Sequence, residues 1–194
     1  NISTAAFKTF TSSHEAKEYI KEKGVPLVIK ADGLAAGKGV VVAESVDEAI
    51  NAIADMMEKR AFGDAGKKVV IEECLKGEEA SFMVFTDGSA IVPMVSAQDH
   101  KRVFDNDKGP NTGGMGAYSP APVVSDALAD KVINEVFKPL LSGLKKDGII
   151  YKGVLYAGLM IDDNQLNVLE FNCRFGDPEA QPILFRLKSD IIEI

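Results

Sequence analysis

The sequence is poor in cysteine, has no excess of positive charge and contains no long apolar run. Two cysteines, Cys74 and Cys173, among 194 residues are too few for the disulfide framework of a small secreted domain, and they suit a reducing cytoplasm. Lys and Arg number 22 against 29 Asp and Glu, a formal net charge of −7, which disfavours nucleic acid as a partner because phosphates require a positive field. No apolar run approaches the roughly 20 residues of a membrane helix. We therefore expect a cytoplasmic protein that binds neither nucleic acid nor a membrane.

The rest of the composition is that of a globular protein. Hydrophobic residues make up 46% of the chain, which is enough to bury a core in one domain or in two small lobes. The chain starts at Asn1 rather than at Met, and residues 188–194 form an apolar, helix-like run that breaks off. We expect a piece of a longer protein.

Helical and extended patterns alternate along the chain. Ser-x-x-Glu patterns at 12–15 and 45–48 each predict the start of a helix, and Ser125 precedes the longest helical pattern. The pairs at 87–88 and 163–164 are turn signals between consecutive strands. Apolar segments at 27–29, 40–42, 69–71, 81–85, 90–95, 154–161 and 166–171 predict strands. Hairpin-linked strands with helices between their groups predict an α+β fold with mainly antiparallel sheets.

One long stretch, residues 97–122, shows neither period. It contains Gly109, Gly113, Gly114 and Gly116 together with prolines. Structureless loops of this length in compact domains are usually functional or disordered, and the mixture of charge with residues of fixed geometry favours function. We expect an irregular functional loop here.

The segment Lys30-Ala-Asp-Gly-Leu-Ala-Ala-Gly-Lys-Gly39 is a glycine-rich turn between two predicted strands. It is not a P-loop, because that motif needs four residues between its glycines, Ser or Thr after the lysine, and a following helix. A glycine-rich hairpin can still fold its N–H groups over a polyphosphate, with Lys38 adding positive charge. Lys30 either reaches the surface or points into a phosphate site, and a lysine on each side of one glycine hairpin favours the phosphate site.

A second segment, residues 72–79, is a carboxylate-rich turn that follows a predicted strand. One interpretation is a charge run exposed to solvent. The other is an adenine hinge, in which backbone groups pair with the base and a carboxylate holds the ribose hydroxyls. The residues alone leave both interpretations open.

The third segment runs from Glu170 to Glu179. Glu170 and Asn172 are two residues apart on a predicted strand, so their side chains point to the same face. Two oxygen ligands on one face suit Mg²⁺, which completes its shell with phosphates and water. Arg174 shares that face and could contact a phosphoryl group in transfer.

The fourth candidate combines Asp99-His100-Lys101-Arg102 with the glycine-rich run at 111–116. Cationic side chains beside backbone that can approach a ligand closely predict a site for anion recognition. His100 by itself has the alternative of an ordinary surface histidine.

Taken in order, these four stretches closely resemble the ATP-grasp domain of the phosphoribosylamine–glycine ligase family, also called glycinamide ribonucleotide synthetases. The resemblance rests on K-A-D-G-L-A-A-G-K-G from Lys30, Q-D-H-K-R from Gln98, P-N-T-G-G-M-G-A-Y from Pro110 and R-F-G-D-P-E-A-Q from Arg174. It covers essentially the whole chain.

The resemblance implies an ATP-grasp fold, in which two α+β lobes close on ATP and metal between mainly antiparallel sheets. We expect a smaller nucleotide-lid lobe within about 25–95 and a larger metal and substrate lobe at about 96–194. The family's N-terminal Rossmann-like region and C-terminal region are absent from this chain, and they would be its partners within one polypeptide.

The resemblance also implies an activity: ATP-dependent ligation of glycine to 5-phosphoribosylamine through glycyl phosphate, in purine biosynthesis. A carboxylate acylates an amine only after activation, and phosphoryl transfer needs positioning and charge neutralisation more than a protein nucleophile. Two alternatives stay open. One is an isolated fragment that binds ATP without completing the reaction; the other is a different ATP-grasp carboxylate–amine ligase, against which the D-H-K-R and G-D-P-E segments argue.

The resemblance assigns roles residue by residue, with ATP and Mg²⁺ or Mn²⁺ as cofactors. A further carboxylate that many ATP-grasp enzymes carry on the preceding strand is absent from residues 155–160. The implied roles are ATP binding by Lys30, Lys38, Glu72, Glu73, Leu75 and Glu79; metal binding by Glu170 and Asn172; catalysis by Arg174 and Lys38; and substrate binding by Asp99, His100, Lys101, Arg102, Asn111, Thr112, Gly113, Gly114 and Asp177.

Overall fold

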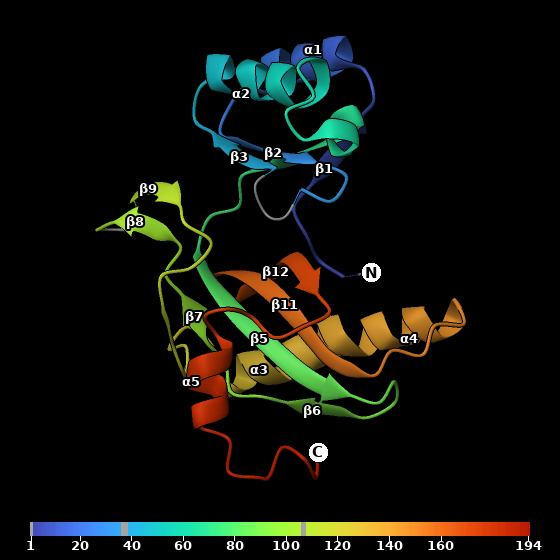
Figure 1. Ribbon diagram of the computed structural model, residues 1–194, viewed down its shortest axis with the longest axis vertical. Helices are drawn as coiled ribbons and strands as arrows, with labels where there is room; N and C mark the ends of the chain where they lie inside the picture. The colour runs from blue at the N-terminus through green and yellow to red at the C-terminus, as the bar shows by residue number, and fades with distance from the viewer. Residues whose placement is uncertain (1, 36–38, 106–107) are drawn as a thin grey trace. The chain divides into compact units, whose positions relative to one another are not determined.

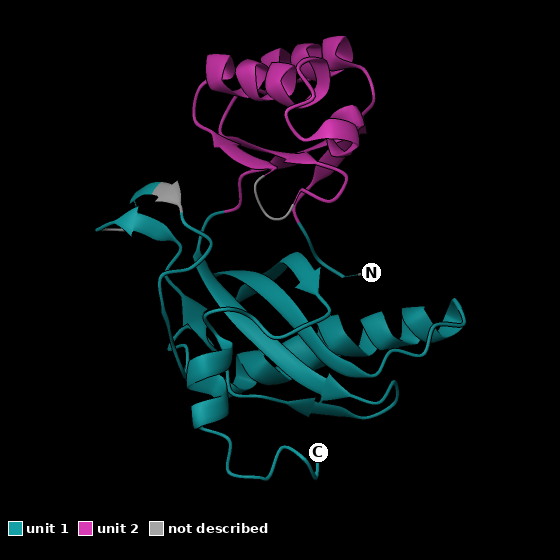
Figure 2. Ribbon diagram, in the orientation of Figure 1, with its two compact units in different colours: residues 1–4, 76–194 teal, residues 5–75 magenta. Residues whose placement is uncertain are grey.

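The protein forms two compact units, shown in a computed structural model that describes residues 2–35, 39–105 and 108–194 (Figures 1 and 2). Unit 2 is Ala5–Leu75, and unit 1 combines Asn1–Thr4 with Lys76–Ile194.

The boundary differs from the expected one near residue 95. Residues 78–93 form strands that hydrogen-bond into the sheet of unit 1, whereas the strand and helix at 7–23 pack on the sheet of unit 2. Strand pairing between distant segments therefore places the division after Leu75, whereas the limits expected from the resemblance were about 25–95 and 96–194.

Unit 2 is a four-stranded antiparallel sheet in the order β1-β4-β2-β3, covered on one face by helices (Figure 1). The strands are β1 (Phe7–Phe10), β2 (Leu27–Ala31), β3 (Val40–Ala43) and β4 (Val69–Glu73); the helices are α1 (Ser13–Lys23), α2 (Val46–Ile53), the π-helix η1 (Ala54–Glu58) and the 3₁₀-helix η2 (Gly63–Lys67).

Both capping signals act as predicted. The Ser12 hydroxyl accepts from the backbone N–H of Glu15 at 3.4 Å, and the Ser45 hydroxyl accepts from that of Glu48 at 3.2 Å. The helices then bury their apolar faces against one side of the sheet, with residues such as Ile29 fully enclosed.

Unit 1 is built on a second antiparallel sheet in the order β12-β11-β5-β6. Its strands are β5 (Glu78–Thr86), β6 (Ile91–Pro93), β11 (Gly153–Asp162) and β12 (Gln165–Asn172). Its helices are α3 (Asp126–Val132), the π-helix η3 (Ile133–Phe137), α4 (Lys138–Lys146) and α5 (Ala180–Phe185). No helix in the described ranges has both the length and the apolar character needed to cross a membrane.

The two faces of this sheet are covered differently. The continuous run from α3 to α4 packs on one face, where Phe82, Phe137 and Leu159 are fully buried (Figure 1). On the opposite face, α5 covers only part of the sheet, through Ile183 packed near Met83. The rest of that face is polar and carries the candidate site.

The hairpin turns are confirmed, but the stretch at 97–122 is more regular than expected. Asp163 and Asn164, with φ of 44° and 65°, turn the chain between β11 and β12. The supposedly irregular stretch contains two small antiparallel ladders, which sequence periodicity misses because each strand is only two to four residues long. They are β7 (Gln98–Asp99) with β10 (Ala117–Tyr118), and β8 (Arg102–Phe104) with β9 (Lys108–Asn111).

Candidate active site

A β-bulge decides which residues of β12 lie on the polar face of unit 1. β11 pairs with β12 so that Leu159 faces Val168 but Gly158 faces Glu170, which leaves Leu169 as an extra residue. Val168 lies in the core beneath α3 and α4, and strict alternation would send Glu170 to that side as well. The bulge turns Glu170 to the polar face instead.

Glu170 and Asn172 share this face, as their spacing predicts. The Asn172 amide Nδ2 donates to Glu170 Oε1 at 3.0 Å. Gly158 leaves space for the carboxylate, because a Cβ added there would lie 3.2 Å from Glu170 Cγ.

This pair fits a magnesium ion that is also bound by a polyphosphate. Within residues 2–35, 39–105 and 108–194, no group of three or more His, Cys, Asp or Glu could hold a metal ion by itself. Mg²⁺ does not require such a group, since it is bound by one or two carboxylates plus substrate phosphates and water. The carboxylate of Glu170 and the amide oxygen of Asn172 are ligands of this kind.

A narrow pocket opens on the same face. It is lined by Glu79, Ala80, Ser81, Asp99, Lys101, Tyr156, Gly158 and Leu159. Lys101 Nζ lies 2.7 Å from Glu79 Oε2. Although burial opposes it, the Glu79 carboxylate raises the pKa of Lys101 above its ordinary value, so the lysine is firmly cationic.

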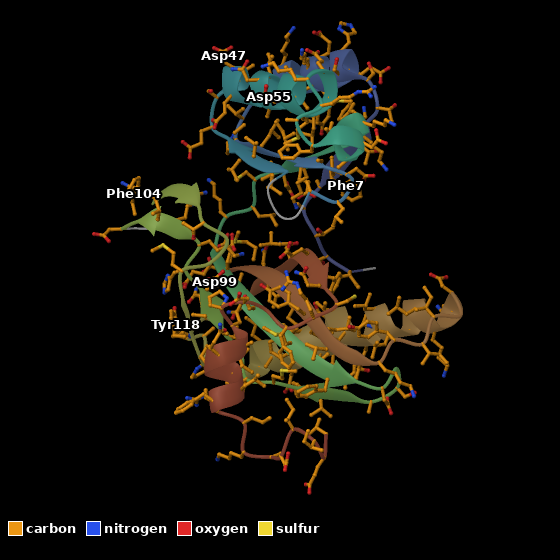
Figure 3. The ribbon with its side chains drawn as sticks, viewed as in Figure 1. Phe7, Asp47, Asp55, Asp99, Phe104 and Tyr118 are labelled. Atoms are coloured by element: carbon orange, nitrogen blue, oxygen red, sulfur yellow. The ribbon has the colours of Figure 1, made fainter. Side chains whose placement is uncertain are left out.

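Asp99, labelled in Figure 3, is a pocket residue whose charged form is disfavoured by its surroundings. Its Oδ1 is buried and has no hydrogen-bond partner among the described residues. Burial raises the pKa of Asp99 to about 6; the charge of Glu179 adds to this effect, and the Lys101 ammonium opposes it. A partly desolvated carboxylate with an unused oxygen is suited to receive a cationic or N–H group of a ligand.

Three segments that are far apart in the sequence meet at Asp99. A Cβ added at Gly114 would lie 2.5 Å from Pro178 Cδ, 3.2 Å from Asp99 Oδ1 and 3.3 Å from the backbone oxygen of Asp177. Gly114 also has φ of +131°, a conformation that only glycine adopts readily. The segments predicted to bind substrates are therefore adjacent within unit 1.

Two further predicted substrate residues are held next to these segments. The Thr112 hydroxyl donates to the backbone oxygen of Lys101 at 2.9 Å. Asp177 Oδ1 accepts from Gln181 Nε2 at 3.0 Å. Both contacts fix the loop backbones that surround the pocket.

The remaining cationic candidates point elsewhere. Arg102 Nη1 donates to the backbone oxygen of Gly109 at 2.9 Å, inside the β8–β9 hairpin marked by Phe104 in Figure 3, and Arg102 does not line the pocket. The His100 ring lies 5.4 Å from that of Tyr118. The exposed Arg174 donates from Nη1 to the adjacent backbone oxygen at 2.8 Å.

Some predicted positions cannot be placed. Lys38, with residues 36–38, lies outside the described residues, and so does the side chain of Asn111. Gly113 lies within the described glycine-rich run and has φ of +89°.

Sequence reasoning missed Glu179 as a buried residue. It is 3% exposed, and its Oε1 accepts from the Ser81 hydroxyl at 2.7 Å and the Tyr156 hydroxyl at 3.0 Å. The only signal in the sequence is its place at the end of the R-F-G-D-P-E run. Nothing in the spacing indicates that Ser81 and Tyr156 are its partners.

Unit 2 carries the nucleotide residues predicted before residue 76. Lys30 on β2 and Glu72 on β4 form an ion pair of 2.7 Å on the sheet face opposite the helices. That face also exposes Phe7, Val40 and Val42. Apolar surface beside one cation suits a flat base with attached phosphates.

The predicted hinge begins with the last two residues of β4, Glu72 and Glu73. Glu73 Oε1 accepts from the backbone N–H of Ala6 at 2.9 Å, and the Glu73 N–H donates to the Ala6 oxygen at 3.0 Å. Leu75 is the last residue of unit 2. Glu73 therefore has a structural contact besides any contact to a base.

Comparison with known proteins decides the family. The profile of "Phosphoribosylglycinamide synthetase, ATP-grasp (A) domain" matches residues 1–180. The chain belongs to this family. Phosphoribosylamine–glycine ligases of Yersinia pestis and Pseudomonas aeruginosa are 57% and 58% identical to it, over 100% and 98% of its length.

Solved structures agree on the ATP-grasp architecture of this phosphoribosylglycinamide synthetase domain. The phosphoribosylamine–glycine ligase of Thermotoga maritima is 41% identical, with a TM-score of 0.82 over 95% of the chain and 46% of that structure. A biotin carboxylase of Campylobacter jejuni is 17% identical, with a TM-score of 0.74 over 99% of the chain and 41% of that structure, which shows the shared fold. The predicted α+β ATP-grasp fold is confirmed, and the chain spans 46% of its relative from Y. pestis.

Proposed function

We propose that this chain is the ATP-grasp part of a phosphoribosylamine–glycine ligase, which joins glycine to 5-phosphoribosylamine through glycyl phosphate and releases glycinamide ribonucleotide, ADP and phosphate. The observation that carries the proposal is the polar sheet face of unit 1, where the Glu170–Asn172 pair lies near a pocket that contains Asp99 and the Lys101–Glu79 pair. In a member of this family, that face offers ligands for a metal–phosphate group and charged partners for small substrates.

The adenosine part of the nucleotide is assigned to four residues. Glu72, Glu73 and Leu75 would contact the adenine through the backbone at the end of β4, and Glu79 would hold the ribose hydroxyls. Support for the ribose role comes from the position of Glu79 at the start of β5, in the same pocket as Lys101. The ribose would share the carboxylate with that lysine.

The phosphates are assigned to Lys30 and Lys38, and Mg²⁺ or Mn²⁺ to Glu170 and Asn172. Lys30 is paired with a carboxylate, so its ammonium is already directed to one side of the sheet. When bound, the metal would neutralise charge on the transferring phosphoryl group. The protein residues orient the phosphate chain and hold the carboxylate of glycine in line with it.

The acyl phosphate is assigned to Arg174, whose guanidinium can bind two phosphoryl oxygens at once. Asp99 would accept hydrogen bonds from an amine, because its Oδ1 is buried without a partner among the described residues. Asp177 is proposed for the glycine ammonium. Other substrate contacts are assigned to His100, Lys101, Arg102, Asn111, Thr112, Gly113 and Gly114.

Two parts of the proposal concern the surroundings of the chain. The chain covers 46% of the length of these relatives. The Rossmann-like and C-terminal regions of a full-length protein are therefore proposed as its partners in completing the site for phosphoribosylamine. The cytoplasm is the proposed location, consistent with two described cysteines that are both free thiols.

The test is an assay of phosphate release by a full-length protein that contains this chain. We expect release only when ATP, glycine and 5-phosphoribosylamine are all present, and none when glycine is replaced by alanine. Release that does not depend on glycine would refute the ligase assignment. Binding of Mg-ATP by the isolated chain without phosphate release would favour the second candidate, a nucleotide-binding fragment that depends on its partners for chemistry.

A further inference from the structure

Glu179 is a buried carboxylate to which none of the proposed chemistry assigns a role. Its two donors, Ser81 and Tyr156, belong to the neighbouring strands β5 and β11, and their hydroxyl oxygens lie 2.9 Å apart. A charged group taken out of water is tolerated only where such bonds compensate it. Hydrogen bonds among the three side chains therefore attach the segment after β12 to strands β5 and β11.

The backbone before Glu179 is fitted closely around its carboxylate. A Cβ added at Gly176 would lie 2.3 Å from Glu179 Oε2 and 2.6 Å from Glu179 Cδ. The N–H of Ala180 donates to the Gly176 oxygen at 3.0 Å. The loop at 174–178 thus wraps around the buried carboxylate, and only glycine fits at its closest point.

The same loop carries groups of the proposed site on its outer side. Arg174 and Asp177 lie within it, and Pro178 Cδ is the atom that a Cβ on Gly114 would meet at 2.5 Å. The loop is therefore bound to the sheet on one side and contacts the glycine-rich substrate segment on the other.

We propose that Glu179, held by the Ser81 and Tyr156 hydroxyls, is a positioning residue that sets the place of the loop bearing Arg174 and Asp177. It acts through this loop and does not touch the reacting atoms. The inference rests on the proposed function for its consequences in turnover, but the anchoring of the loop can be tested without it.

The charge of Glu179 supports the same role. Burial is the largest cause of the raised pKa of Asp99, and the charge of Glu179 is the next. Glu79 also raises this pKa, whereas Lys101 and, to a smaller extent, His100 lower it. The anchor and the pocket are therefore electrostatically connected. Loss of the charge should move the ionisation of Asp99 to lower pH.

The first experiment measures hydrogen exchange in the chain itself. The variants Ser81→Ala and Tyr156→Phe each remove one donor with little change in shape, and the double variant removes both. We expect exchange of the backbone amides between residues 175 and 183, which exclude Pro178 and Pro182, to accelerate about tenfold or more in the double variant, the range expected when bonds to a charged group are lost. Tyr151→Phe is the matched control, because it removes a hydroxyl that donates to the Val154 oxygen at 2.6 Å away from Glu179.

The second experiment measures turnover in the full-length protein. We expect kcat to fall by up to about a hundredfold in the double variant, since small displacements of positioned groups have effects of this size, while the KM for Mg-ATP stays within about twofold because Glu170 and Asn172 are untouched. Glu179→Gln keeps the shape and one acceptor, so it should retain more activity than Glu179→Ala. The acidic limb of the pH profile of kcat for Glu179→Gln should also lie at lower pH than that of the parent.

The outcomes separate the positioning role of Glu179 from the proposed function. Unchanged exchange at 175–183 in the double variant, or parental kcat in that variant, would overturn the positioning role. An equal loss of kcat and of Mg-ATP affinity would also overturn it, because it would indicate a general structural defect. If the parental full-length protein does not ligate glycine, the proposed function fails, and the exchange experiment still decides the anchor.

Discussion

Replacement of Asp99 by Asn should make unit 1 more stable at neutral and alkaline pH. The reason is the unfavourable environment of the charged carboxylate, whose pKa burial raises from 3.8 to about 6, with a further contribution from Glu179. Asn has nearly the same shape but carries no charge, so the variant removes the electrostatic penalty and leaves the packing in place.

The magnitude follows from the shift in pKa. A difference of about two units corresponds to about 3 kcal/mol at 1.4 kcal/mol per unit. Asp99 is partly exposed, so solvent screening reduces this figure, and we expect about 1–1.5 kcal/mol of added stability.

The effect should depend on pH in one direction. Between about pH 4 and pH 6 the folded protein keeps the Asp99 proton that the unfolded chain has lost, so this residue makes the free energy of unfolding fall as pH rises. Below about pH 4 both states are protonated and the penalty is absent. The advantage of Asp99→Asn should therefore appear above about pH 6 and vanish near pH 4.

The assay is urea unfolding of the parent and variant at about pH 4 and about pH 8, followed by hydrogen exchange in β11, which reports on unit 1. Asp162→Asn is the control, because it removes a carboxylate that is exposed at the end of β11. A variant that is less stable than its parent at about pH 8, or a gain of equal size at both pH values, would show that the charge of Asp99 is not the source of strain.

Three further outcomes test the site. Glu170→Gln should weaken Mg-ATP binding at least about tenfold in calorimetry while the melting temperature is unchanged; unchanged affinity would remove it from the metal ligands. Gly114→Ala should cost about 1–3 kcal/mol and displace the loop at Pro178, because its φ is +131° and its Cβ would meet Pro178 at 2.5 Å, whereas Gly116→Ala, which has open space, should have little effect on thermal unfolding. Arg174→Lys should lower kcat of the full-length protein about 10²–10³-fold with less effect on ATP affinity; parental kcat would exclude a catalytic role.

Local signals in the sequence predict much of the fold. The capping serines at 12 and 45 bind the N–H groups that the motif specifies, and the turn at 163–164 adopts the positive φ angles that Asp and Asn tolerate. These features depend on residues a few positions apart, so the sequence displays them directly.

Features that depend on distant partners could not be predicted. Glu179 has a partner 98 residues earlier in the chain, Ser81, and no periodicity links the two. The division after residue 75 depends on which strands pair with β5, and the short ladders of β7 to β10 are below the length at which alternation is visible. The common face of Glu170 and Asn172 was predictable from their spacing, but the side of the sheet on which they lie was not.

That side is determined by the strand pairing around the bulge at Leu169, which places Glu170 opposite Gly158, rather than by the chemistry of any side chain. Deletion of Leu169 would remove the bulge but would leave Val168 opposite Leu159 and Glu170 opposite Gly158, so Glu170 and Asn172 would stay on the polar face. In sequence alignments of the family, a one-residue gap at Leu169 is therefore compatible with an unchanged polar face.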